Sequence, residues 1–299
     1  MYFEFTTIFR RIVDWVGLVG ILILTVSKVT ADVQISSPVF GGGVSNHIVL
    51  NGSDSRQQLL VTHTQSNTFV ADLTRSVQLN SEPKGLVRIS NGLVEPLSNG
   101  KGKIYIGDKS KSGSNITFEV KNFENYKQVN FSNSIVPLFT KHGCNGGGCH
   151  GKSGGQNGFK LSLLGFEPQE DFEYLLREAR GRRLFPAAPE RSLLLLKASG
   201  QLPHGGGSRI DPNSFDYKMI VNWMRQGMPF GQPTDPKLES IEVHPRERVM
   251  KKGAQQQLVV LARMTDGSVE DITHSSVYES NDRESVSYTH LTLPTKRIV

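Results

Sequence analysis

Gln-Gln-Leu at residues 57–59 and Asp-Leu-Thr at residues 72–74 form a pair of motifs that the chain repeats. The second pair reads Gln-Gln-Leu at residues 256–258 and Asp-Ile-Thr at residues 271–273, with the same spacing inside the pair. Segments of one chain that share motifs at one spacing are predicted to share one fold. In an Asp-x-Thr motif we expect the side chains to bind nearby backbone amides in a turn, and not to perform catalysis.

Short runs of alternating apolar and polar residues surround the first pair. Turn residues separate them, with Asn-Gly at residues 51–52, 91–92 and 99–100. Short strands at this spacing, with such turns, are typical of a β-sandwich. We therefore predict an all-β sandwich over residues 32–128 and a partial one over residues 237–283.

Between these two sandwiches the hydrophobic periodicity becomes helical, over residues 129–232. Capping residues and apolar spacing predict a helix that ends at Gly143, two or three further helices, and a closing helix that runs to Gly227. This layout predicts a small all-α domain. The predicted fold class is thus multidomain, with a sandwich, an all-α domain and a truncated sandwich.

Both cysteines of the chain, Cys144 and Cys149, lie directly after the first of these helices, and His150 follows. Two thiols and a neighbouring histidine are what a covalently bound haem c needs, with the imidazole as proximal ligand of the iron. The usual spacing has two residues between the cysteines, and here there are four. Glycines at residues 146–148 can take positive φ and loop out the extra length.

Three alternatives compete with covalent haem at this loop. Two cysteines in an oxidising compartment usually pair, so a disulfide between Cys144 and Cys149 is the first. The second is a zinc site that adds one further ligand to Cys144, Cys149 and His150, although the second ligand arm typical of such sites is missing. Two free thiols are the third.

These motifs resemble two known families. The middle segment resembles the planctomycete-type cytochrome c domain through Cys144, the Cys-His-Gly at residues 149–151, the Pro-Glu-x-Ser-Leu-Leu at residues 189–194, and Trp223 before Gly-Met-Pro at residues 227–229. The β segments resemble the bacterial Ig-like domain, group 2, through the repeated Asp-x-Thr motifs. The resemblance implies an exported chain that combines a haem c domain with Ig-like modules.

The cytochrome resemblance also implies a distal iron ligand in the loop before the closing helix. His204 occupies that loop, after Pro203 and before the glycines at residues 205–207, which allow close approach of the backbone to the porphyrin. Met228, at the end of the closing helix, is the alternative distal ligand. An iron with both axial positions filled cannot bind small substrates, so we expect electron transfer and no enzymatic activity.

The first 31 residues are predicted to be an export signal. They contain a basic pair at residues 10–11, a mostly apolar stretch over residues 12–26, and small residues before a mature start near Asp32. An uncleaved membrane anchor is the alternative, but the apolar run is short for a span of about 20 residues. We expect the protein in the periplasm or at the cell surface, with membrane association only through this signal.

The chain of 299 residues has a formal net charge of +6, but its lysines and arginines form no clustered stripe. This favours a solvated surface over nucleic-acid binding. We predict a redox partner protein of unknown identity, and the sequence does not determine the oligomeric state. The alternative function is a non-redox surface or interaction protein, in which Cys144 and Cys149 form a disulfide or part of a metal site. Residues 284–299 have no counterpart in the first sandwich and are predicted to be a non-native tail.

Overall fold

The structure of the chain is a computed structural model that describes residues 31–66, 68–107, 113–125 and 128–280. Most of the predicted export signal and the whole predicted tail lie outside the described residues. In the described part of the chain no helix is long and apolar enough to cross a membrane.

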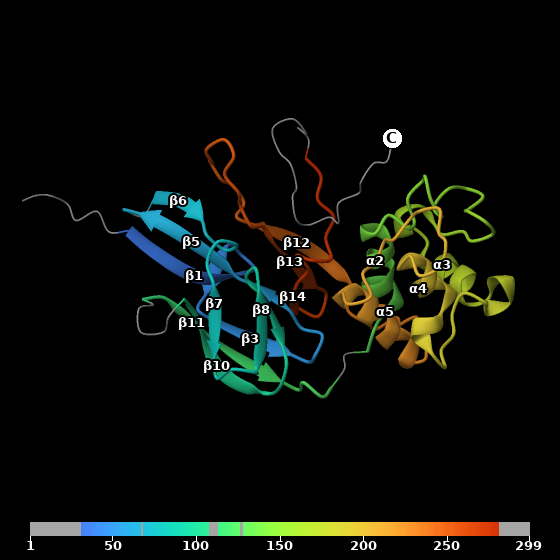
Figure 1. Cartoon of the computed structure of the whole chain (residues 1–299), viewed down its shortest axis with the longest axis horizontal. Helices are drawn as coiled ribbons and strands as arrows, with labels where there is room; N and C mark the ends of the chain where they lie inside the picture. The colour runs from blue at the N-terminus through green and yellow to red at the C-terminus, as the bar shows by residue number, and fades with distance from the viewer. Residues whose placement is uncertain (1–30, 67, 108–112, 126–127, 281–299) are drawn as a thin grey trace, which may run out of the picture.

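The described residues form three parts of the chain. Residues 31–125 are the first repeat, residues 128–237 the linking segment and residues 238–280 the second repeat. Figure 1 shows the strands of the first repeat toward one end of the view and helices α2–α5 of the linking segment toward the other, with strands β12–β14 of the second repeat drawn between them.

The first repeat consists of strands only. Its sheets have the strand orders β2-β1-β5-β6, β3-β11-β10-β7 and β4-β9-β8. The pairing is antiparallel except between β11 and β3, which run parallel. The strands are β1 (Ala31–Val39), β2 (Gly43–Ser45), β3 (His47–Asn51), β4 (Gln57–Gln58), β5 (Leu60–Gln65), β6 (Thr68–Asp72), β7 (Leu79–Glu82), β8 (Val87–Ser90), β9 (Leu93–Pro96), β10 (Gly100–Ile106) and β11 (Asn115–Lys121).

The core of the first repeat lies between its sheets. Strand β11 shows how the sequence builds it, because Ile116, Phe118 and Val120 alternate with more exposed residues and are all buried. They pack with apolar side chains from both large sheets, and every member of this core cluster comes from the first repeat itself. The first repeat therefore closes its own hydrophobic core.

One hairpin of the first repeat confirms a turn that the sequence predicts. Asn91 and Gly92 join β8 to β9, and both have positive φ, at 49° and 79°. A two-residue hairpin loop needs this geometry, and Asn-Gly adopts it most readily.

The second repeat has one sheet of strand order β12-β13-β14 in the described part of the chain. Its central strand is buried over nearly its whole length, and Val259 and Leu261 pack against Leu60 of the first repeat. The three strands are β12 (Leu238–His244), β13 (Val259–Met264) and β14 (Val269–Asp271).

The linking segment contains short helices around an apolar centre. Trp223 is fully buried there, next to Phe131 and Phe172, and its indole N–H donates to the carbonyl of Pro229 at 2.9 Å. A π-helical turn at Phe131–Ile135 leads into the first α-helix. The helices are α2 (Val136–Lys141), α3 (Pro168–Leu176), α4 (Leu193–Ala198) and α5 (Phe215–Arg225).

The predicted fold class was wrong in its middle part. The described chain is mostly β-sheet and 20% helical, and it contains no sizeable all-α haem domain. Helices α2–α5 have 6 to 11 residues each. Helices this short are marginal by themselves, and the glycine-rich stretches at residues 143–158 and 200–207 interrupt them. Loops held by tertiary contacts therefore take up much of a segment that the periodicity assigns to helices.

Candidate functional site

The loop with both cysteines, residues 144–150, begins where α2 ends. We call it the cysteine loop. Gly143 has a φ of 69°, in the left-handed region that ends many helices. The N–H of Cys144 then donates to the carbonyl of Phe139 at 2.8 Å. The end of α2 therefore determines where Cys144 enters the loop.

Backbone hydrogen bonds inside the cysteine loop close it on itself. The N–H of Cys149 donates to the carbonyl of Gly146 at 2.9 Å, and that of His150 donates to the carbonyl of Cys144 at 3.0 Å. The four residues between the cysteines thus form a compact turn, which places the backbone of His150 next to that of Cys144.

The glycines that shape this loop are not the ones that the sequence suggests. The expectation that residues 146–148 take positive φ was wrong, since Gly143 is the residue beside the loop that does so. The essential glycine is Gly151, where a Cβ would lie 2.0 Å from the carbonyl oxygen of Asn145. Asn145 is itself fully buried, so it cannot easily move away.

His150 is held in one tautomer by its surroundings. Its Nδ1 lies 3.0 Å from the carbonyl oxygen of Phe159, and the two rings are 4.6 Å apart between centroids. Because a carbonyl can only accept, Nδ1 carries the proton and Nε2 keeps a free lone pair. Burial lowers the pKa of His150, although the Phe159 carbonyl acts in the opposite direction, and the ring is therefore neutral at pH 7.

The structure brings His204 beside His150. The two imidazole planes are parallel within 6°, and the ring centroids are 6.2 Å apart. His204 is also held in one tautomer, because its Nδ1 lies 3.0 Å from the carbonyl oxygen of Gly207. The two rings form a stacked pair.

The cysteines are free thiols, so the structure does not contain the disulfide alternative. Burial raises the pKa of Cys144 to about 11, although the charge of Arg209 lowers it. A thiol with such a pKa is protonated at neutral pH and is a poor thiolate ligand. Within the described residues no three His, Cys, Asp or Glu side chains are grouped to hold a metal ion. The side chains of the cysteine loop are therefore not arranged as the zinc alternative requires.

Apolar side chains are exposed beside the cysteine loop. The N–H of Leu164 donates to the carbonyl of Asn145 at 3.0 Å, and Leu163 lies 3.7 Å from the place that a Cβ on Gly147 would occupy. Both leucines are more than half exposed, and the nearby Phe166 is 83% exposed. Leu164 also has a φ of 54°, which is strained for leucine. Clustered exposed apolar side chains are typical of a surface that an apolar ligand or partner covers.

Two arginines that the sequence analysis did not select support this site. Arg183 is buried, donates to the carbonyls of Tyr174 and Glu178, and lies 4.6 Å from the centroid of the Phe159 ring. Arg209 lies next to Gly143, and it lies near Gly206 as His204 does. Carbonyl and ring contacts of this kind leave no local pattern in a sequence, so spacing could not have found them.

Met228, the alternative distal ligand, lies against the core at the end of α5. Its N–H donates to the carbonyl of Trp223 at 2.9 Å, and its side chain packs on the apolar centre of the linking segment. Of the two predicted distal ligands, His204 is the one that the structure places in ring contact with His150.

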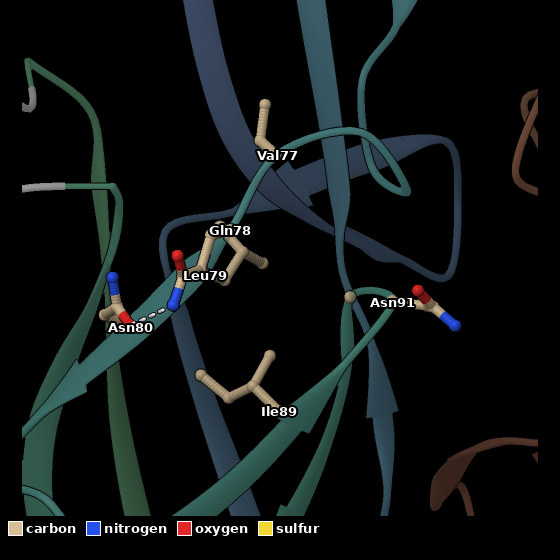
Figure 2. A pocket seen from close by; sticks show the side chains of 7 residues that line it. Val77, Gln78, Leu79, Asn80, Ile89 and Asn91 are labelled. Atoms are coloured by element: carbon tan, nitrogen blue, oxygen red, sulfur yellow. Dashed lines mark hydrogen bonds between the residues drawn. The ribbon is translucent and has the colours of Figure 1, made fainter.

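A surface pocket of about 360 Å³ lies in the first repeat and not at the cysteine loop. Figure 2 shows its lining, in which the side-chain amide of Gln78 donates to that of Asn80 at 3.5 Å. None of the residues that line this pocket has a titratable or nucleophilic side chain. These residues are Val77, Gln78, Leu79, Asn80, Ile89, Asn91 and Gly92.

Neither a family model nor a curated protein matches this chain.

Proposed function

We propose that the linking segment binds one haem c and that the chain transfers electrons outside the cytoplasm. Cys144 and Cys149 form the thioether bonds, His150 is the proximal ligand and His204 the distal ligand. The observation that carries this proposal is the parallel pair of imidazoles, 6.2 Å apart between centroids, each with its Nδ1 held by a backbone carbonyl.

The residues present suit such a group. A ligating histidine usually donates its other N–H to a carbonyl or carboxylate, which orients the ring and raises its basicity. His150 and His204 both meet this condition. The exposed Leu163, Leu164 and Phe166 offer apolar cover. Arg209 offers a cation for the haem carboxylates, because guanidinium groups pair well with them.

Electron transfer is the activity that two axial histidines favour. A bound haem supplies one-electron exchange, and its iron has no open position for a substrate when both axial positions are filled. The role of the chain is then to orient the two imidazoles and to keep water from them. The resemblance to planctomycete-type cytochromes c supports the same cofactor, and the predicted export signal supports the same compartment.

The test is expression of the full chain together with a haem c maturation system. After denaturing electrophoresis, haem stain is expected to migrate with the polypeptide, and Cys144→Ser combined with Cys149→Ser is expected to abolish it. Polypeptide without haem stain, or with a quantitative disulfide between the two cysteines, would overturn the proposal.

The distal ligand has its own test on the same material. His204→Ala is expected to keep the haem but to open a position for carbon monoxide or cyanide, whereas Met228→Ala, the matched control, leaves the spectrum unchanged. If Met228→Ala opened that position and His204→Ala did not, the assignment of His204 would be wrong.

A further inference from the structure

The two repeats contact each other through equivalent residues. The N–H of Gln58 donates to Oδ2 of Asp271 at 2.6 Å, and the N–H of Gln257 donates to Oδ2 of Asp72 at 2.7 Å. The side-chain amides of the preceding glutamines, Gln57 and Gln256, donate to the same two oxygens. Each repeat therefore supplies both the donors and the acceptor of the contact.

Each of the two aspartates joins its own turn to the other repeat. Oδ1 of Asp72 accepts from the N–H of Thr74 at 2.8 Å, and Oδ1 of Asp271 accepts from the N–H of Thr273 at 2.9 Å. These bonds confirm the predicted Asp-x-Thr turns. One carboxylate oxygen thus stays inside the repeat, and the other crosses to the opposite repeat.

Side chains near these two carboxylates also form contacts across the two repeats. Oε1 of Gln58 contacts Nε2 of His274 at 2.9 Å, and Oε1 of Gln257 accepts from Nε of Arg75 at 3.2 Å. His274 and Arg75 hold equivalent positions, three residues after the aspartates. In the apolar centre between the repeats, Leu60 packs in one cluster with its equivalent Val259. We call these ten residues the repeat joint: Gln57, Gln58, Leu60, Asp72, Arg75, Gln256, Gln257, Val259, Asp271 and His274.

Reciprocal contacts between equivalent residues define a twofold, isologous interface, in which one patch meets a copy of itself. We propose that the joint surface of the first repeat is self-complementary and binds the first repeat of a second copy of this chain whenever the second repeat is not seated on it. In that dimer Gln58 of each copy donates to the partner's Asp72, so this contact occurs twice. The two copies of Leu60 pack against each other in the centre.

The intact chain is expected to remain a monomer. The second repeat belongs to the same chain as the first, so their contact does not depend on protein concentration, whereas binding of a second copy does. The dimer therefore forms only when the joint within one chain is opened.

The full chain provides the test. Asp271→Arg removes an acceptor from the second repeat and places a cation against the donors of the first, while the joint surface of the first repeat stays intact. We expect sedimentation to show a change from monomer to dimer at about 100 µM, where a dimer with a micromolar Kd is populated. Asp271→Arg combined with Asp72→Asn is expected to remain a monomer, because an asparagine at residue 72 retains Oδ1 but replaces the crossing acceptor with a donor.

Glu239→Arg is the matched control, since it reverses a charge at an exposed position of the same repeat and should remain a monomer. The proposal is overturned if Asp271→Arg remains a monomer. It is equally overturned if the added Asp72→Asn leaves the dimer undiminished.

If Asp271→Arg aggregates, the isolated first repeat decides the question. It closes its own core, so residues 31–128 can be expressed alone. A folded wild-type fragment that sediments as a dimer, with a folded Asp72→Asn fragment that sediments as a monomer, supports the proposal. A monomeric wild-type fragment at the same concentration refutes it.

Discussion

At the scale of single residues, the candidate site depends on a glycine that leaves room for a neighbouring backbone carbonyl. Gly148 lies in open space, and a Cβ there would have nothing within 4 Å. Gly151 is in the opposite situation, because the carbonyl of Asn145 occupies the space where its Cβ would be. The two glycines look equivalent in the sequence, but only Gly151 is required by the packing.

These two glycines provide a matched pair of variants. Gly151→Ala should lower the free energy of unfolding by about 1–3 kcal/mol, the usual cost of overpacking a tight site. It should also reduce haem attachment, since the cysteine loop must shift. Gly148→Ala should have little effect on the free energy of unfolding and on haem attachment. Thermal unfolding and haem staining measure the two effects, and equal losses in both variants would contradict this account of the loop.

At the scale of elements, short helices are joined by buried polar side chains. Asp216, in the first turn of α5, accepts a hydrogen bond from Nε2 of His142 at 2.8 Å and pairs with Lys141 at the end of α2. An acidic side chain at a helix start and basic ones at a helix end also suit the two helix dipoles. This contact ties α5 to the helix that leads into the cysteine loop.

The Asp216 contact predicts a loss of stability in acid. Burial raises the pKa of this carboxyl, but the hydrogen bond from His142 and the charge of Lys141 outweigh burial and lower the pKa to about 2. A lowered carboxyl pKa stabilises the fold above the unfolded value near 4, and this contribution is lost as the pH falls toward 2. It amounts to about 2 kcal/mol.

Asp216→Asn should therefore be less stable than the wild type at pH 7 and should show a smaller further loss between pH 4 and pH 2. Chemical unfolding at several pH values measures both. Glu239→Gln, at an exposed position, is the control and should follow the wild-type profile. An unchanged profile for Asp216→Asn would show that the contact contributes nothing.

At the scale of the whole molecule, three parts of the chain meet around one cation. Arg56 of the first repeat lies 3.5 Å from the centroid of the Phe215 ring in α5 and donates to Oγ of Ser275 in the second repeat at 3.4 Å. Arg56 therefore links both repeats to the linking segment. Beside it lies His274 of the repeat joint, whose pKa the charge of Arg56 helps to lower.

The joint is expected to weaken in acid because of His274. Burial lowers the pKa of His274 to about 4, and the charges of Arg56, Lys141 and Arg75 act in the same direction, against that of Asp216. The unfolded ring titrates near pH 6.5. Stability is thus complete above about pH 6.5 and decreases by about 3 kcal/mol as the pH falls to 4, because unfolding then takes up a proton.

His274→Gln retains a donor for Gln58 but does not titrate, so its stability should change less between pH 7 and pH 4. Hydrogen exchange of the β13 amides, measured at both pH values, reports this difference for the second repeat itself. His63→Gln, on strand β5 of the first repeat, is the control and should behave as the wild type. If His274→Gln lost as much stability between pH 7 and pH 4 as the wild type, His274 would not be the source of that loss.

Local signals in the sequence determined the features that depend on neighbours along the chain. The Asn-Gly turn at residues 91–92 and the Asp-x-Thr turns formed as predicted, because backbone preference and side-chain-to-backbone hydrogen bonds act over a few residues. The position of the cysteine loop directly after a helix was predictable for the same reason.

Tertiary structure alone decided which distant residues meet. The exchange of Asp72 and Asp271 between the repeats joins positions far apart in the sequence. The contact of His150 with His204 does so too, and only the cytochrome resemblance had predicted that these two act together. The extent of the helices was also decided there, and the periodicity overestimated it. Helical spacing records only which side chains face a core, whereas the length of a helix depends on the free energy that packing adds to a marginal local preference.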